Sequence, residues 1–312
     1  MSGVGEHEAA AVTAEALSVL RSGRPGAGAE GAARLRQAVS LGSGEAAATL
    51  AYFAAAGLGQ SADWDRSLDL LQQAAELGWA PAMSELRVLA RRMDGDASVL
   101  RAAIDIGTCV AAREMRIVCE GPRIGAIDRF FSAEECAWLI DTALNRLAPA
   151  AVYARDRQRG EVMSARTNST ADFGILDMDV VFTVLRHRIA NTTGFPPAHF
   201  EQPAVLHYAP GQQFKPHYDF LDARFEGPAA ELRARGQRLA TFLVYLNQDF
   251  EGGETEFPLI DYRFKGKTGD AIVFANVDPN LAPELKSKHA GRAPTRGEKW
   301  LLSQWVRDRA QI

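Results

Sequence analysis

The pattern of apolar positions changes near residue 110 and divides the chain into two regions. Up to about residue 106 the sequence is rich in Ala and Leu, with apolar residues at helical spacing and Gly between the helical stretches. From about residue 115, short runs rich in β-branched and aromatic residues alternate with Gly and Pro. We therefore expect an α+β multidomain chain, with an α-helical region over 1–110 and a mixed domain over 115–312.

The helical region contains an internal repeat. The stretch LRQAVSLGSGEAAATL at 35–50 aligns with LQQAAELGWAPAMSEL at 71–86, at an offset of 36 residues. A period of this length, with small residues at helix contacts and Gly at the turns, is typical of stacked helix pairs. The region that contains these two stretches resembles a Sel-type, tetratricopeptide-like repeat. Two roles remain open for it: a groove for a protein partner, or a helical cap that solubilises the protein or joins two copies into a homodimer.

Helices flank a series of short strands in the second region. RIGAIDRFFSAEECAWLID predicts a strand and then a helix, with Ser132 and Glu135 at the spacing of a capping box. Apolar residues on one stripe predict a second helix within 176–194. The predicted strands are PAVLHYA, FKPHYDF, LATFLVYLN, ETEFPL, DAIVFANV and KWLLSQWVR. Strands of this length and spacing are typical of an antiparallel sandwich or barrel.

Composition and charge argue against several classes of protein. A net charge of −4 argues against a nucleic-acid-binding protein built on a broad basic face. No apolar run reaches the length of about 18 residues that a membrane helix needs, and the first residues lack the pattern of a secretory signal. The cysteines form no CxxC pair, which favours reduced thiols in a cytoplasmic protein over a disulfide framework.

A histidine and a carboxylate lie two positions apart in the stretch HYAPGQQFKPHYDF at 207–220. Positions i and i+2 of a strand face the same side, so His217 and Asp219 should project together while Tyr218 points away. Such a pair can supply two ligands of a 2-His-1-carboxylate iron site. Taken alone the pattern also fits a structural pair, because His-x-Asp is common by chance.

A third ligand would have to come from the other histidines, which are His7, His187, His199, His207 and His289. His289 lies ten residues before Lys299, where the last predicted strand begins. Three protein ligands would leave open positions on octahedral iron for a 2-oxo acid and dioxygen. The far carboxylate of that acid needs a buried cation, which Lys299 could supply. A histidine in a turn and a lysine at a strand edge are the alternatives.

Several stretches of 120–312 together resemble the prolyl 4-hydroxylase branch of the 2-oxoglutarate- and Fe(II)-dependent oxygenases. They are RTNST, VLHYAPGQQFKPHYDF, RLATFLVYLNQDFEGGETEFP, KGKTGDAIVFANVD and HAGRAPTRGEKWLLSQWV. The resemblance implies a double-stranded β-helix, or jelly roll, with flanking helices. It also implies Fe(II) and 2-oxoglutarate as cofactor and co-substrate, with ascorbate as the reductant.

The resemblance also implies roles for individual residues. Those implied to bind iron and act in catalysis are His217, Asp219 and His289. Those implied to bind 2-oxoglutarate or line its pocket are Lys299, Tyr208 and Thr241. Those implied to lie on the substrate side are Arg166, Glu201 and Trp305. Core packing remains an alternative for Trp305, and a surface salt bridge for Arg166.

Three features bear on the substrate. Phe214 stands where the family usually has Tyr, and Gly-Arg-Ala-Pro at 291–294 stands where it commonly has Gly-Cys-Pro. The polar stretch 222–238, with its Gly and Pro residues, predicts a mobile lid. A plain surface loop or a short exposed helix are the alternatives for that stretch.

The expected function is hydroxylation of an unactivated C–H, in a prolyl residue of a protein or peptide, with release of succinate and CO2. No nucleic acid or membrane partner is expected. The first alternative is the same chemistry on a free amino acid or other small molecule. The second is a metal-binding jelly roll that does not turn over.

Overall fold

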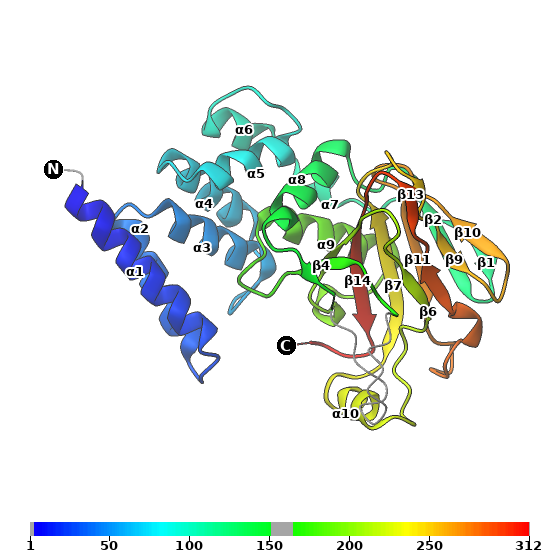
Figure 1. Ribbon diagram of the computed structural model, residues 1–312. Coiled ribbons are helices and arrows are strands. Elements are labelled where there is room, and N and C mark those ends of the chain that lie inside the picture. The colour runs from blue at the N-terminus through cyan, green and yellow to red at the C-terminus, as the bar shows by residue number, and fades with distance from the viewer. Residues whose placement is uncertain (1–2, 151–164, 312) are drawn as a thin grey trace. The chain divides into compact units, whose positions relative to one another are not determined.

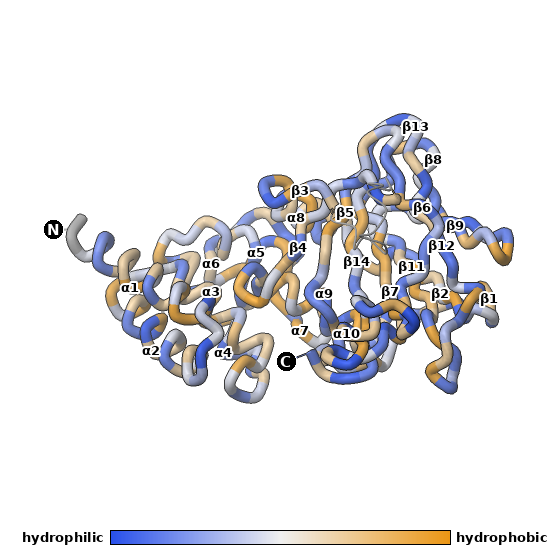
Figure 2. Tube along the Cα trace, turned by 60° about the horizontal axis from the view of Figure 1, so that its bottom comes forward, coloured by the Kyte–Doolittle hydropathy of each residue, from blue (hydrophilic) through white to orange (hydrophobic). Residues whose placement is uncertain are grey.

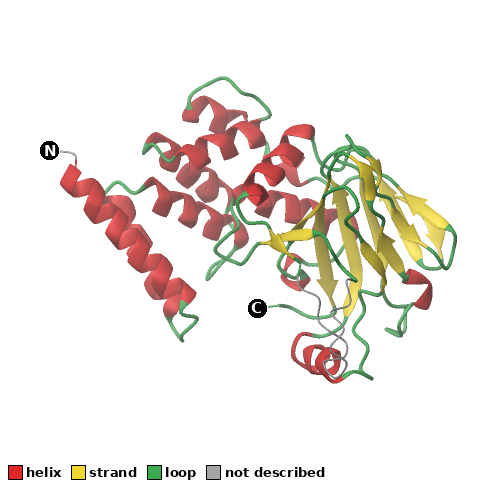
Figure 3. Cartoon of the chain, in the orientation of Figure 1, coloured by secondary structure: helices red, strands yellow, loops and turns green. Residues whose placement is uncertain are grey.

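The computed structural model describes residues 3–150 and 165–311, and the chain forms two compact units. The first comprises 1–112 with 174–191 and is helical, whereas the second comprises 113–173 with 192–312 and contains the strands (Figures 1 and 3). A helical region followed by a sheet-rich domain was predicted, and this fold class is confirmed. None of the described helices combines the length and apolar character needed to cross a membrane.

The helical unit consists mainly of consecutive helices. They are α1 (Gly3–Arg21), α2 (Ala27–Ser40), α3 (Gly44–Ala56), α4 (Trp64–Glu76), α5 (Ala80–Ala90), α6 (Ala97–Ala103), α7 (Ile106–Val110) and, from later in the chain, α9 (Val180–Thr193). The predicted division assigned residues 174–191 to the second region, but their contacts place them here. The buried Glu85 of α5 accepts a hydrogen bond from the N–H of Val180 (3.0 Å) and so caps α9.

The helix pairs α2–α3 and α4–α5 show the predicted offset of 36 residues. Gly42 and Gly78 follow equivalent helix ends with φ of 96° and 84°, a conformation that favours glycine. Ala38 and Ala74 are fully buried, and their carbonyl oxygens accept equivalent hydrogen bonds from the N–H groups of the residues that follow each turn. The repeated geometry is therefore present, while assignment to the Sel type stays a prediction.

Antiparallel sheets form the second unit. The large sheet, in spatial order, is β1 (Arg116–Glu120), β2 (Arg123–Ile127), β11 (Ala271–Ala275), β7 (Arg238–Tyr245), β14 (Lys299–Arg307), β5 (Ala204–Tyr208), β4 (Ser169–Asp172) and β3 (Ala148–Pro149). The small sheet is β10 (Tyr262–Phe264), β9 (Thr255–Phe257), β12 (His289–Gly291) and β6 (Phe214–His217). A further pair joins β13 (Pro294–Arg296) to β8 (Glu251–Gly252).

The core of this unit lies between the large and small sheets. Phe257 of β9 packs in one buried cluster with Leu243 of β7 and Phe274 of β11. Figure 2 shows the central strands β5 and β7 as hydrophobic, whereas β6 of the small sheet is largely hydrophilic. The large sheet therefore supplies most of the apolar core, and the small sheet can carry polar side chains into the interior. This is the sandwich that the short strands predicted.

Short helices complete the unit. They are α8 (Ala133–Leu144), α10 (Glu226–Arg235) and the single 3₁₀ turns η1 (Pro197–His199) and η2 (Leu285–Ser287). The predicted capping box of α8 is present, because Ser132 Oγ accepts from the Glu135 N–H and the Glu135 carboxylate accepts from the Ser132 N–H. α10 occupies the polar stretch 222–238 and buries none of its residues, which matches the exposed-helix alternative. Movement of this stretch as a lid stays a prediction.

Candidate metal centre and co-substrate pocket

A cavity opens between the two sheets, lined by alternate positions of the strands. The lining residues from the large sheet are Thr170, Asp172, Ala204, Leu206, Tyr208, Thr241, Leu243, Leu301, Ser303 and Trp305. Their two-residue spacing along each strand shows that one face of the sheet points inward. Arg166, Phe214, His217, Asp219, Thr255, His289 and Gly291 complete much of the wall. The cavity therefore joins the predicted metal ligands to most of the other predicted site residues.

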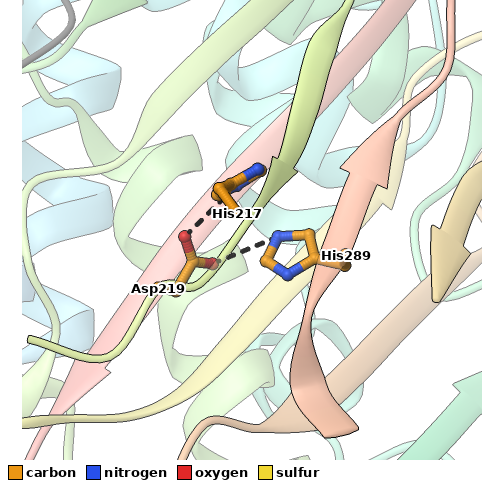
Figure 4. A group of neighbouring side chains, drawn as sticks. All are labelled: His217, Asp219 and His289. Atoms are coloured by element: carbon orange, nitrogen blue, oxygen red, sulfur yellow. Dashed lines mark ion pairs between the residues drawn. The ribbon is translucent and has the colours of Figure 1, made fainter. Parts of the chain in front are cut away.

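His217, Asp219 and His289 converge on one point of this wall. His289 of β12 lies directly opposite His217 of β6 in the strand register, and Asp219 lies two residues past the end of β6 (Figure 4). His217 Nε2 is 3.6 Å from Asp219 Oδ1, and His289 Nε2 is 3.5 Å from Asp219 Oδ2. Both separations exceed a hydrogen bond and suit donor atoms on neighbouring positions around one ion. The predicted strand 214–220 ends early, at His217, so Asp219 reaches the site from the segment that follows.

The backbone orients both imidazoles. His217 Nδ1 lies 2.8 Å from the carbonyl oxygen of Lys215, and His289 Nδ1 lies 3.1 Å from that of Ser287. A carbonyl only accepts, so each Nδ1 carries the proton and each Nε2 keeps its lone pair. The two lone pairs therefore face Asp219, as a metal centre requires.

Burial and charge shift the pKa values of His289 and Asp219. Burial lowers the pKa of His289 to about 4, so its imidazole is neutral near pH 7. Burial alone would raise the pKa of Asp219, but the net shift is downward, and the nearby Arg238 guanidinium contributes to it. Within 3–150 and 165–311 the cluster contains these three donors and no fourth His, Cys, Asp or Glu. Three donors of this kind fit Fe(II) and leave coordination positions open.

Lys299 supplies a buried cation opposite Tyr208 in the strand register; Tyr208 lines the cavity, whereas Lys299 itself is not among the lining residues. Its side chain is fully buried, and its Nζ has no hydrogen-bond partner within the described residues. Nζ lies 5.1 Å from the ring centroids of both Tyr208, its cross-strand neighbour, and Tyr245. Burial lowers the pKa of Lys299 to about 7, and Glu254 offsets this only in part. An unpaired buried ammonium is costly, and a carboxylate of 2-oxoglutarate would satisfy it.

The GGET turn lies against Lys299. Gly252 and Gly253 have φ of 67° and 71°, and a Cβ on Gly253 would lie 2.7 Å from the Phe250 ring and 3.3 Å from Lys299 Cδ. Glycine therefore lets this turn pack closely over the lysine. Thr255, the last residue of the turn, lines the cavity, and its hydroxyl lies 2.9 Å from that of Tyr245. Our sequence reasoning missed Thr255, although the GGET motif could have indicated it.

Thr241 has a more specific contact than the sequence indicated. It was expected to line the co-substrate pocket, and it does line the cavity, but its hydroxyl donates to Asp219 Oδ2 (2.7 Å). Asn276 Nδ2 in turn donates to Thr241 Oγ1 (2.9 Å). No sequence pattern pointed to Asn276, because the contact joins the end of β11 to β7.

Of the predicted substrate-side residues, Arg166 and Trp305 line the cavity and Glu201 does not. The Glu201 carboxylate accepts hydrogen bonds from Arg238 Nε and Arg307 Nε, each at 2.6 Å. It is therefore engaged in a buried ion-pair cluster. The Arg238 guanidinium also stacks over the Trp305 ring, 3.6 Å from its centroid, and thereby connects the cluster to the cavity wall.

Phe214 packs between neighbouring side chains of the cavity wall. Its ring stacks on the His217 imidazole with a centroid distance of 3.4 Å, and the Arg166 guanidinium lies 4.8 Å from the Phe214 centroid. The aromatic ring thus contacts both the arginine and a metal-ligand histidine. The hydroxyl that the family's usual Tyr would carry here is absent from this chain.

Comparisons with known proteins agree with this geometry. Residues 203–307 match the model of the 2OG-Fe(II) oxygenase superfamily. Probable prolyl 4-hydroxylase 3 of Arabidopsis thaliana is 31% identical over 204 residues, which cover 59% of this chain and 69% of that protein. Prolyl 4-hydroxylase 1 of the same plant is 32% identical over 231 residues, which cover 70% and 77% of the two chains.

Solved structures were also compared. The viral collagen prolyl hydroxylase of Paramecium bursaria Chlorella virus-1, in its 2OG complex, is 29% identical and superposes with a TM-score of 0.46. That alignment covers 61% of this chain and 98% of the viral protein. On the sequence relationships above, the chain belongs to the prolyl 4-hydroxylase branch of the 2-oxoglutarate-dependent dioxygenases, enzymes that use Fe(II) and 2-oxoglutarate.

Proposed function

We propose that this enzyme hydroxylates a prolyl residue of a protein or peptide, converting one C–H to C–OH while 2-oxoglutarate and O2 become succinate and CO2. The observation that carries the proposal is a three-donor cluster in one cavity together with Lys299, which faces the cavity-lining Tyr208 across two strands and whose ammonium has no hydrogen-bond partner among the described residues. The bound iron and 2-oxoglutarate would supply the oxidising chemistry. The names of the plant relatives support proline as the target.

The protein residues would hold the reactants and exclude water. His217, Asp219 and His289 would bind the metal through Nε2, one carboxylate oxygen and Nε2. Lys299 would bind the far carboxylate of 2-oxoglutarate, and the buried Tyr208 hydroxyl lies on the adjacent strand to donate a further hydrogen bond. Apolar residues such as Leu301 and Leu243 line the cavity between these groups, which keeps the local dielectric low.

Two donors at the cavity wall suit a peptide substrate. Trp305 Nε1 is buried and has no hydrogen-bond partner in the described part of the chain, although the indole lines the cavity. Arg166 Nε donates to Asn168, but no carboxylate pairs with this guanidinium within the described residues. Peptide carbonyl oxygens could accept from both groups, and leaving a buried donor unsatisfied costs about 1–3 kcal/mol. These donors support a backbone-containing substrate over a free amino acid.

A coupled assay tests the proposal. The purified chain would be given Fe(II), 2-oxoglutarate, ascorbate and proline-containing peptides, each paired with a control peptide in which Ala replaces Pro. We expect succinate formation together with addition of one oxygen atom to the proline peptides, seen by mass spectrometry. Asp219→Ala serves as the inactive control.

Other outcomes favour the alternatives. Succinate formation that is stimulated by free amino acids but by no peptide would favour a small-molecule substrate. No succinate under any condition, despite metal binding, would favour a non-catalytic module.

A further inference from the structure

A relay of two hydrogen bonds reaches the Asp219 carboxylate from outside the ligand set. Thr241 Oγ1 donates to Asp219 Oδ2 at 2.7 Å, and Asn276 Nδ2 donates to Thr241 Oγ1 at 2.9 Å. The exposed fraction is 5% for Asp219, 1% for Thr241 and 0% for Asn276, so water does not compete for these hydrogen bonds.

The donor and acceptor of each hydrogen bond in the relay follow from the number of hydrogens that each group can donate. A hydroxyl group carries a single hydrogen. Because Asn276 already donates to the hydroxyl oxygen of Thr241, the hydroxyl hydrogen is directed to Asp219, which can only accept. Asn276 Oδ1 has no hydrogen-bond partner among the described residues, so the bond from Nδ2 to Thr241 is the one that this side-chain amide makes there.

Rigid backbone fixes the outer end of the relay. The Asn276 N–H donates to the carbonyl oxygen of Leu239, and its carbonyl oxygen accepts from the N–H of Glu284. Thr241 lies in β7, with Phe274 of β11 as its cross-strand partner. Asp219, by contrast, lies beyond the end of β6 and belongs to no strand. The relay thus connects a ligand outside regular structure to the centre of the large sheet.

We propose that Thr241 and Asn276 are positioning residues for Asp219: they hold Oδ2 and leave Oδ1 to the metal ion. The inference rests on the proposed role of Asp219 as a ligand, and it concerns metal affinity, not the identity of the hydroxylated substrate. Hydrogen bonds that orient a ligand in this way typically change metal affinity by about 10- to 100-fold.

The test measures Mn(II) affinity of the metal-free full chain by isothermal titration calorimetry. Thr241→Val keeps the shape of the side chain and removes the hydroxyl. Thr241→Ser keeps the hydroxyl. Asn276→Asp keeps the shape but offers only acceptors to Thr241, so the hydroxyl hydrogen is drawn away from Asp219. Thr183→Val removes a buried hydroxyl of the helical unit, one that donates to the Asp179 carbonyl oxygen, and is the matched control.

We expect Thr241→Val and Asn276→Asp to weaken Mn(II) binding by about 10- to 100-fold. Thr241→Ser and Thr183→Val should bind Mn(II) with nearly the wild-type affinity. Wild-type Mn(II) affinity in Thr241→Val would overturn the proposal. Wild-type affinity in Asn276→Asp alone would overturn the part assigned to Asn276. Should Thr241→Val fail to fold, Asn276→Asp still decides the outcome. None of these measurements needs a hydroxylation substrate, so failure of the proposed function would be seen separately.

Discussion

Replacing Lys299 by Met should have opposite effects on co-substrate binding and on the stability of the ligand-free chain. The Lys299 side chain is fully buried, and its Nζ makes no hydrogen bond to any of residues 3–150 and 165–311. Burial lowers its pKa from 10.5 to about 7. At about 1.4 kcal/mol per pKa unit, keeping the proton on this buried amine costs about 5 kcal/mol. The free enzyme carries this cost, and binding of a carboxylate removes it.

The magnitude for binding follows from the pair that the substitution breaks. In Lys299→Met the far carboxylate of 2-oxoglutarate would be buried without a cation, which costs about 3–5 kcal/mol. The dissociation constant should therefore rise by about two to three and a half powers of ten. Met carries no charge to desolvate, so the ligand-free variant should be more stable than the wild type, by about 1–4 kcal/mol.

The pH dependence has a definite sign. Between pH 7 and 10.5 the unfolded chain holds the Lys299 proton and the folded chain does not, so the stability of the wild type should rise with pH in this window. Lys299→Met should lack this rise. The facing Tyr208 and Tyr245 stay neutral there, because burial raises both their pKa values, that of Tyr208 to about 12. The charge of Glu254 raises the pKa of Lys299 and so partly offsets the lowering of that pKa by burial.

Calorimetry checks both effects. Titration of 2-oxoglutarate in buffers of different ionisation enthalpy should show proton uptake above pH 7, because the bound carboxylate raises the lowered pKa of Lys299. Scanning calorimetry measures stability. Lys265→Met is the control, because its ammonium already donates to the Phe250 carbonyl oxygen at 2.7 Å. Unchanged 2-oxoglutarate affinity in Lys299→Met would refute this reasoning.

Three further predictions concern the other charged groups. Asp219→Ala should lose both site-bound Mn(II) and succinate formation, measured by calorimetry and by the coupled assay. Arg307→Leu should destabilise the strand-containing unit by about 3–5 kcal/mol, because Glu201 and Glu231 lose a buried partner; urea unfolding followed by tryptophan fluorescence measures this. Burial alone would raise the pKa of Glu201, but Arg238 and Arg307 lower it below 4.5, so stability should fall as the pH drops through that lowered value. A flat acid titration would exclude this contribution.

Local sequence patterns predicted the elements well because they depend on neighbours along the chain. The last strand was predicted from KWLLSQWVR and is observed as Lys299–Arg307. The strand through His217 was predicted too long, because alternation alone does not show where pairing with β12 stops. The helix within 176–194 was predicted, but its grouping with the helical unit depends on distant contacts such as the cap from Glu85.

Contacts between distant strands limited what could be predicted of the site. The spacing of His217 and Asp219 was informative, whereas the position of His289 opposite His217 is a cross-strand relation that a single sequence does not show. The same limit explains why Asn276 was missed. The family resemblance implied a substrate-side role for Glu201, which does not line the cavity; Arg238 and Arg307 bind its carboxylate.

The donors of the candidate metal centre are divided between the two layers of the sandwich. His217 and His289 belong to the small sheet, whereas Asp219 is tied through Thr241 to the large sheet. An ion held by all three would cross-link the layers, so metal loading should slow amide hydrogen exchange in β6 and β12 as well as complete the site. For this enzyme, iron supply would then govern how long the folded chain survives, in addition to how fast it works.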